Sequence, residues 1–272
     1  MHEMSSTPAA TPWRLPLRKV NQEPAPRVYR LLVRAVHVVA PLLTKRHWSR
    51  QDVVPSTGGV LLVANHISNY DVLVLGEFLI WSGRWPRFLG KSEIFKTPVL
   101  GWVARQCGQI PVLRNTTNAK QSLVFARKAL EEGNMVAVYP EGTITKDPDG
   151  WPMSARRGAA HLALTTGVPV VPVGQIGAEG VLGGPKIQWG KLFSLRRRPV
   201  YVLGGDPVDL DRFRTEGKDP SLETLDLATV AIMDAIVALV EQLRKDTAPE
   251  GRWDMRTGSR VVPRRGSTSG QQ

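Results

Sequence analysis

The stretch GVLLVANHISNYD spans Gly59 to Asp71. Its first six residues, which end at Ala64, form a continuously apolar run of the kind typical of a strand buried on both faces. A polar turn follows, and the apolar segment from Val72 to Ser82 then predicts a helix. A buried strand that leads through a short turn into a helix indicates an α/β sheet.

The same alternation continues along the chain. Further strands are predicted at 111–113, 135–139, 170–175 and 200–203, and helices at 28–43, 118–132, 158–166 and 222–245. We therefore expect one α/β domain with a central, mostly parallel or mixed sheet flanked by helices and an N-terminal amphipathic helix. This domain is predicted to span residues 28–245, between basic tails at 1–27 and 246–272 that are expected to be disordered.

The composition is that of a globular protein, with 42% hydrophobic and 22% charged residues, and the net charge is +12. A basic surface attracts nucleic acid, anionic lipid headgroups or phosphorylated substrates, and charge alone does not choose among them. The single cysteine, Cys107, excludes an intramolecular disulfide. No secretory signal pattern is seen, and no window reaches the roughly 18 to 20 apolar residues of a membrane-spanning helix.

The helix predicted at 28–43 allows two interpretations. Arg30, Arg34 and His37 recur along one helical stripe, and apolar residues cover most of the remaining surface. The helix could be a core element with one solvated edge, or a basic interfacial helix that lies among lipid headgroups. The many basic residues between Trp13 and Arg50 favour the second interpretation, and both can hold for different faces.

The turn after the first strand carries the chemistry. Histidine exchanges a proton near neutral pH, and a carboxylate five residues later can reach its second ring nitrogen across a turn. His66 is therefore predicted to act as a base, with Asp71 fixing its tautomer and stabilising the imidazolium. A structural alternative stays open, because Ser68-x-x-Asp71 before an apolar run is also a helix-capping pattern and His66 alone could be a structural histidine.

Three more segments follow in order. GQIPVLR ends in the cation Arg114; YPEGT offers the carboxylate of Glu141, the glycine Gly142 and the hydroxyl of Thr143; and VPVVPV at 168–173 is an apolar strand with two prolines. With the N-H-x4-D turn, this ordered set over residues 65–173 resembles the lysophospholipid acyltransferase family, of the type that makes phosphatidic acid from 1-acylglycerol-3-phosphate. The matching positions are His66 and Asp71 for the catalytic pair, Arg114 for the acceptor phosphate, and Glu141, Gly142 and Thr143 for the third motif.

The chain departs from this family in the third motif, which usually opens with phenylalanine and closes with arginine. Tyr139 and Ile144 stand at these positions. The loop therefore lacks its usual phosphate contact. Lys146, Arg156 or Arg157 could supply it, because a phosphate needs positively charged donors but not a donor at one fixed sequence position. The predicted substrate contacts are Lys91, Arg114, Glu141, Gly142, Thr143 and Arg157.

The resemblance implies transfer of a fatty acyl chain from a thioester donor to the free hydroxyl of 1-acylglycerol-3-phosphate, giving phosphatidic acid in phospholipid biosynthesis. The donor would be acyl-CoA or an acyl carrier protein thioester, and no bound cofactor or metal is expected. The expected partners are a lysophospholipid, an anionic membrane surface and, as a further candidate, acyl carrier protein, with no nucleic acid. The expected location is the cytoplasmic face of the cell membrane, as a peripheral protein.

Other functions stay open. The acceptor could be another lysolipid, glycerol-3-phosphate or a glycolipid. A hydrolase in which His66 and Asp71 activate water is less favoured, because the chain has no G-x-S-x-G nucleophile elbow and no H-E-x-x-H metal helix. A nonenzymatic binder of membranes or nucleic acid fits the charge, but no zinc-ligand spacing or RNA-binding aromatic motif accompanies it.

Overall fold

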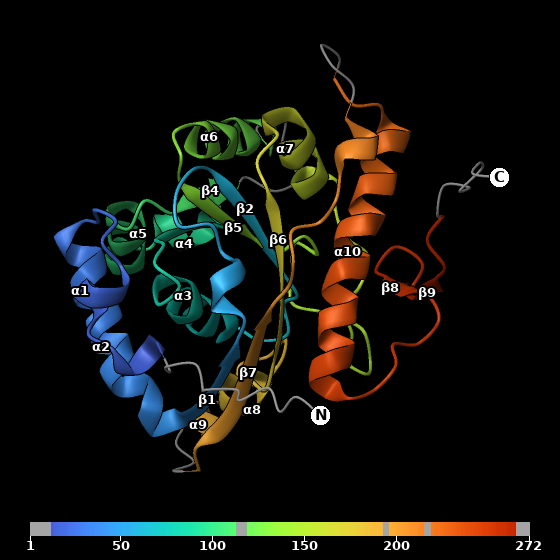
Figure 1. The fold of residues 1–272 in the computed structure, drawn as a ribbon. Coiled ribbons are helices and arrows are strands. Elements are labelled where there is room, and N and C mark those ends of the chain that lie inside the picture. The colour runs from blue at the N-terminus through green and yellow to red at the C-terminus, as the bar shows by residue number, and fades with distance from the viewer. Residues whose placement is uncertain (1–11, 113–118, 193–195, 215–218, 265–272) are drawn as a thin grey trace, which may run out of the picture.

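The computed structural model describes residues 12–112, 119–192, 196–214 and 219–264. Within these residues a central sheet of seven strands, in the order β1-β7-β6-β2-β5-β3-β4, carries helices on both faces (Figure 1). Neighbouring strands are parallel except β6 and β7, which are antiparallel. The predicted fold class, an α/β domain with a mostly parallel mixed sheet, flanking helices and an N-terminal helix, is confirmed.

The strands of the described residues are β1 (Thr44–Ser49), β2 (Val60–Ala64), β3 (Pro86–Lys91), β4 (Ile110–Val112), β5 (Met135–Val138), β6 (Val170–Ile176), β7 (Arg198–Gly204), β8 (Arg252–Asp254) and β9 (Ser259–Val261). The helices are α1 (Leu17–Val20), α2 (Arg27–Leu43), α3 (Asp71–Ile80), α4 (Ser92–Lys96), α5 (Pro98–Gln106), α6 (Ala119–Glu131), α7 (Gly158–Thr166), α8 (Glu179–Leu182), α9 (Trp189–Leu192) and α10 (Leu222–Arg244). Short 3₁₀ helices cover Pro12–Arg14, Gln51–Val53 and Asp211–Phe213.

The strand β2 divides the hydrophobic core into two layers. Its alternate side chains Val60, Leu62 and Ala64 pack in one layer with α2 and α3, while Leu61 and Val63 pack in the other with α6, α7 and α10. All five side chains are completely buried. A parallel strand covered by helices on both faces requires this continuous apolar run.

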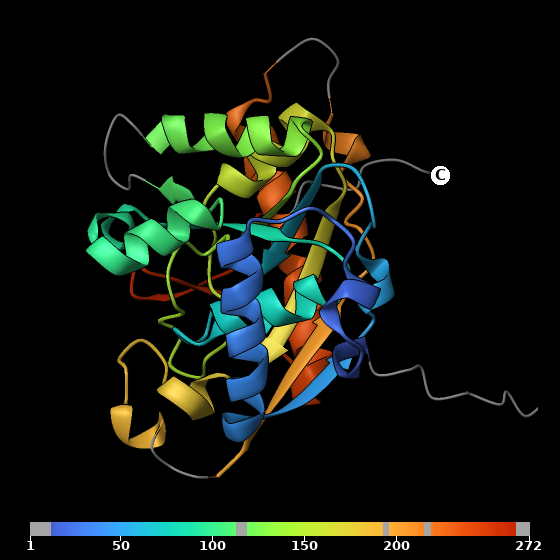
Figure 2. The ribbon, with the colours of Figure 1, turned by 90° about the vertical axis from the view of Figure 1, so that its left-hand side faces the viewer.

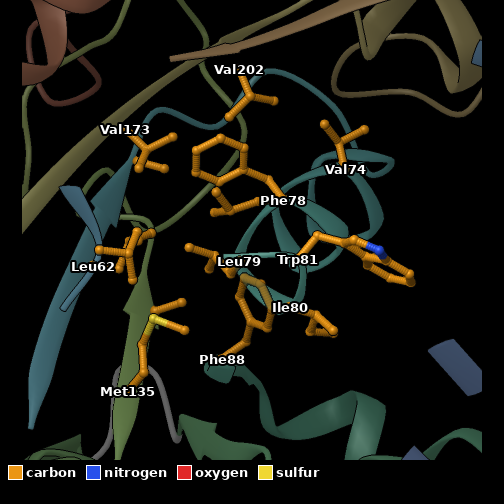
Figure 3. Close-up of a cluster of buried hydrophobic side chains, with 14 of the residues drawn as sticks. Leu62, Val74, Phe78, Leu79, Ile80, Trp81, Phe88, Met135, Val173 and Val202 are labelled. Carbon is orange, nitrogen blue, oxygen red and sulfur yellow. The ribbon is translucent and has the colours of Figure 1, made fainter. Parts of the chain in front are cut away.

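The layer that contains α3 fixes the start of that helix. Phe78 is completely buried and points from α3 toward Val173 of β6 and Val202 of β7 (Figure 3). Full burial of a phenylalanine side chain stabilises the folded state by roughly 1.5–3 kcal/mol. Since α3 begins at Asp71, this packing also sets the position of the Asp71 carboxylate relative to the sheet.

The described part of the predicted N-terminal tail contacts the rest of the domain. Trp13 meets Trp48 edge-on, with ring centroids 5.1 Å apart. Glu23 accepts a hydrogen bond of 2.8 Å from Nε of the completely buried Arg84. These are long-range contacts, so the local proline-rich composition does not reveal them.

The described part of the predicted C-terminal tail also contacts the domain. The strands β8 and β9 pair as an antiparallel hairpin. From this hairpin, Arg260 donates two hydrogen bonds of 2.9 Å to the buried carboxylate of Asp147. This contact joins residues that are more than a hundred positions apart in the chain.

Along the described residues, no helix combines the length and the apolar character that crossing a bilayer demands.

Candidate active site

The candidate site lies at the carboxyl ends of neighbouring parallel strands. His66 follows β2, Glu141 follows β5, and Lys91 is the last residue of β3. The strands β2, β5 and β3 are adjacent and parallel, so the turns that follow them meet at one edge of the sheet. The fold thus brings together motifs that are far apart in the sequence.

His66 and Asp71 are in direct contact. Nδ1 of His66 lies 2.9 Å from Oδ2 of Asp71, whose side chain is completely buried, while the His66 side chain is 16% exposed. With Nδ1–H donating to the carboxylate, Nε2 is the nitrogen that carries the free lone pair. This is the geometry of a histidine base whose tautomer is set by a carboxylate.

The Asp71 carboxylate also organises the turn. Its Oδ2 accepts hydrogen bonds from the backbone N–H groups of Ile67 (2.6 Å) and Ser68 (2.9 Å). The hydroxyl of Ser68 does not complete a capping box, because the Asp71 N–H donates to the Ser68 carbonyl oxygen and the Ser68 hydroxyl accepts the Tyr70 N–H instead. Asp71 therefore holds the turn and the imidazole together, and the two interpretations of its role are compatible.

The charge state of Asp71 reflects two opposing effects. Burial raises the pKa of the carboxyl group, and the hydrogen bonds from the His66 ring and the amides of Ile67 and Ser68 act against that rise. These donors favour the ionised carboxylate, which is the form that can stabilise a protonated imidazole.

The loop after β5 holds the backbone of His66. Oε1 of Glu141 accepts the His66 N–H at 2.8 Å, and Oε2 accepts the Met153 N–H at 3.0 Å. The Thr145 N–H donates to the His66 carbonyl at 2.7 Å. Burial raises the pKa of Glu141 to about 8, although both hydrogen bonds lower it. Glu141 is 1% exposed and does not line the cavity described below, so it positions His66 through the loop.

Two contacts at this edge were not predicted from the sequence. The ring of Tyr139 stacks on that of His66, with centroids 4.1 Å apart and planes 12° apart. Asn65 and Gln175 exchange three hydrogen bonds of 2.8 Å, which tie the ends of β2 and β6. The sequence shows Asn65 next to His66 and an aromatic residue before Pro140. The partners of these two residues can be identified only when the order of the strands in the sheet is known.

An apolar cavity of about 410 Å³ opens beside this pair. His66, Gly142 and Lys91 line it, and apolar side chains from α2, α3, α4, α5 and β3 supply most of the remaining wall. Its size falls within the range of about 300–1,000 Å³ that is usual for ligand pockets. A hydrocarbon chain in this cavity would therefore lie next to the imidazole.

The predicted substrate contacts divide into separate groups. Lys91 is exposed and lines the cavity together with Gly142. Thr143 is half-exposed and is not part of the cavity wall. Arg157 does not line the cavity either, because its guanidinium group binds both oxygens of Asp226 on α10, at 2.5 and 2.6 Å. Arg114 lies outside the described residues.

In the part of the chain that the structure describes, no group of three or more His, Cys, Asp or Glu side chains is placed to hold a metal ion.

Part of the chain is similar to a known protein family. Residues 45–175, somewhat less than half of the chain, match the model of a family described as Acyltransferase. The chloroplastic 1-acyl-sn-glycerol-3-phosphate acyltransferase LPAT1 of Arabidopsis thaliana is 34% identical over 174 residues, 61% of this chain and 44% of the relative. The lyso-ornithine lipid O-acyltransferase of Pseudomonas aeruginosa is 31% identical over 114 residues, 42% of each protein. The chain thus spans less than half the length of either relative.

A solved structure has a similar fold. The crystal structure of the 1-acyl-sn-glycerophosphate acyltransferase PlsC from Thermotoga maritima superposes with a TM-score of 0.59 at 23% sequence identity. The superposition covers 81% of this chain and 83% of the other. At this identity the likeness concerns the arrangement of the sheet and its helices.

Proposed function

We propose that the chain is an acyltransferase of the family that its residues 45–175 match, and that it transfers a fatty acyl chain from a thioester donor to the free hydroxyl of 1-acylglycerol-3-phosphate, which gives phosphatidic acid. The observation that carries the proposal is the His66–Asp71 pair, 2.9 Å apart, at the wall of an apolar cavity. The activity named for the Arabidopsis relative supports the choice of acceptor. This reaction belongs to phospholipid metabolism.

The proposed chemistry follows from the free lone pair on Nε2. As the acceptor hydroxyl oxygen attacks the thioester carbonyl, its proton passes to Nε2 of His66, and Asp71 stabilises the resulting imidazolium. The carbon–sulfur bond then breaks, and the departing thiolate takes the proton from His66. A thioester has a good leaving group of its own, so no covalent enzyme intermediate is needed. The donor is acyl-CoA or an acyl carrier protein thioester.

The cavity offers a place for the acyl chain. Its wall is formed largely by apolar residues, among them Val36, Gly76, Phe88 and Val103 from four different elements. Apolar lining with a few polar groups at the reacting end is the usual design of a pocket for such a ligand. Since His66 belongs to the same wall, a chain in the cavity would present its carbonyl near the imidazole.

A membrane surface is the proposed source of the acceptor. On α2, Tyr29 and Val33 are buried, while Leu31, Val38 and Leu42 are 63%, 72% and 68% exposed. The exposed side of this helix also carries basic residues, so the core and interfacial interpretations of the helix apply to different faces. Such a mixed apolar and basic face suits the headgroup region of an anionic bilayer.

The helix α5 extends this apolar face. It packs beside α2 (Figure 2) and exposes Val99, Leu100 and Trp102 by 73%, 62% and 50%. Leu32 of α2 and Leu100 of α5 are exposed and also line the cavity. The cavity therefore reaches the face that we propose rests on the cytoplasmic surface of the membrane, and a lipid would enter without crossing bulk water.

A matrix of donors and acceptors tests the proposal. The purified protein would be assayed with acyl-CoA and acyl carrier protein thioesters against 1-acylglycerol-3-phosphate, glycerol-3-phosphate and lyso-ornithine lipid, with product identification by mass spectrometry. We expect phosphatidic acid to be the main product. Preferential acylation of lyso-ornithine lipid would replace the proposed acceptor, and release of free fatty acid without any acceptor would point to a hydrolase.

A further inference from the structure

The loop after β5 has no cation at the position where residue 144 lines the cavity. Ile144 occupies this position, is 8% exposed and lines the cavity. An isoleucine extends the apolar wall but cannot bind an anion. A phosphorylated acceptor at His66 therefore needs its positive partner from another part of the chain.

Arg156 lies against the same loop. Its backbone N–H donates to the Pro140 carbonyl at 3.0 Å. Its side chain passes over Gly142, since a Cβ atom added there would come within 3.3 Å of Nε and 3.4 Å of Cδ of Arg156. Gly142 also has a φ of +73°, in the left-handed region that favours glycine. Glycine at this position thus allows both the turn and the close approach of the arginine.

This location is next to the catalytic candidates. Gly142 and His66 line the same cavity, and the residue between Pro140 and Gly142 is Glu141, which binds the His66 N–H at 2.8 Å. The stem of Arg156 therefore passes beside the backbone that holds the imidazole in place.

The guanidinium group of Arg156 is available to an external anion. The side chain is exposed, and among the described residues no carboxylate lies within ion-pair distance of it. Its neighbour Arg157 differs, because Asp226 neutralises it through two short hydrogen bonds. Of the two adjacent arginines, only Arg156 combines a position beside the cavity wall with an uncommitted charge.

We propose that Arg156 binds the phosphomonoester of the acceptor. The inference rests on the proposed function, because it assumes a phosphorylated acceptor. A planar guanidinium group can donate two parallel N–H bonds to two phosphate oxygens. Lys91, at the end of β3, supplies a second positive charge from the cavity wall. The phosphate is then held at the mouth of the cavity, and Ile144 contributes to its apolar part.

The test compares two acceptors that differ in the phosphate alone. Initial rates would be measured at a saturating donor concentration with 1-acylglycerol-3-phosphate and with the corresponding monoacylglycerol, for the wild type, Arg156→Ala, Arg156→Lys and Arg157→Ala. Lys128→Ala on α6 removes another exposed positive charge, from a residue that does not line the cavity, and serves as the control. Thermal unfolding checks that each variant is folded.

For Arg156→Ala we expect the KM for the phosphorylated acceptor to rise by about tenfold to a hundredfold, the range for lost hydrogen bonds to a charged group. The kcat should change little, and the KM for monoacylglycerol should stay the same. Arg156→Lys should recover part of the loss because it keeps the charge. An unchanged KM in Arg156→Ala, an equal rise for both acceptors, or a larger rise in Arg157→Ala would overturn the inference.

A direct binding measurement separates this inference from the proposed function. Glycerol-3-phosphate, as the soluble headgroup, would be titrated into the wild type and Arg156→Ala by calorimetry. Weaker binding by Arg156→Ala supports the phosphate site even if another acyl reaction is the true one, and equal binding overturns it. Failure of the wild type to make phosphatidic acid would overturn the proposed function alone.

Discussion

The substitution Asp71→Asn separates the structural from the chemical role of the carboxylate. In the wild type, Oδ2 accepts from Nδ1 of His66 and from the amides of Ile67 and Ser68, at 2.6 to 2.9 Å. Oδ1 is buried and has no hydrogen-bond partner among the residues that the structure describes. An asparagine keeps all three hydrogen bonds only if its carbonyl oxygen takes the place of Oδ2. Its NH₂ group then takes the place of Oδ1, since the opposite orientation would set donors against donors.

The orientation of the asparagine amide determines the expected changes in stability and in kcat. A buried NH₂ group without an acceptor costs about 1–3 kcal/mol of stability. The loss of a buried charge, whose burial raises the pKa of Asp71, offsets part of that cost. The variant should therefore fold. It lacks the negative charge that stabilises the imidazolium, so kcat should fall by about 10²- to 10⁴-fold.

The assay is the initial rate of acyl transfer at saturating donor and acceptor, with urea unfolding of the same preparation. We expect a large loss of kcat, little change in the KM for the acceptor, and a free energy of unfolding within about 3 kcal/mol of the wild type. A folded Asp71→Asn enzyme that works within a few-fold of the native rate would refute the role assigned to the carboxylate.

Three further predictions concern the surroundings of the pair. Burial raises the pKa of Glu141 to about 8, so the folded protein keeps a proton that the unfolded chain loses near pH 4.5. The free energy of unfolding of the wild type should therefore fall as the pH rises from about 5 to 8, by at most about 5 kcal/mol from this group. Glu141→Gln should lack this component, and parallel stability curves in urea unfolding would contradict it. Gly76 lines the cavity and its Cβ position faces Phe88 at 3.7 Å, so Gly76→Leu should lower kcat/KM for long acyl donors more than for short ones; an unchanged donor profile would count against an acyl chain in the cavity. Arg260→Ala should lower the free energy of unfolding by about 1–3 kcal/mol, because it leaves the carboxylate of Asp147, 1% exposed, without its cation, and the double variant with Asp147→Asn should recover part of the loss.

Elements with a strong local pattern could be predicted from the sequence. The apolar run of β2 and the helix α7, found at Gly158–Thr166, lie where the patterns indicate. The strands β1 and β3 were not predicted. β1 is a mostly polar segment whose only partner among the described strands is β7, and β3 begins at Pro86 and contains Gly90. Their extended conformation comes from pairing with distant strands, which no local pattern encodes.

In the candidate site, too, some contacts are indicated by the local sequence and others depend on distant packing. The contact between His66 and Asp71 follows from a five-residue spacing across a turn, so the sequence alone indicates it. The pairing of Arg157 with Asp226 and the closeness of Arg156 to Gly142 depend on how α10 and the loop after β5 pack. Sequence reasoning could name the cations near the site, but only the packing separates Arg157, which pairs with Asp226, from Arg156, which has no carboxylate partner in the described part of the chain.

The claim that Nε2 of His66 takes the proton from the acceptor hydroxyl is tested most directly by the turnover of purified His66→Ala. The assay would use an acyl thioester and 1-acylglycerol-3-phosphate, and thermal unfolding would show that the variant is folded. We predict that kcat falls by at least about 10²-fold, since the general base is lost. Phosphatidic acid formed at the native rate by the folded variant would contradict the assignment.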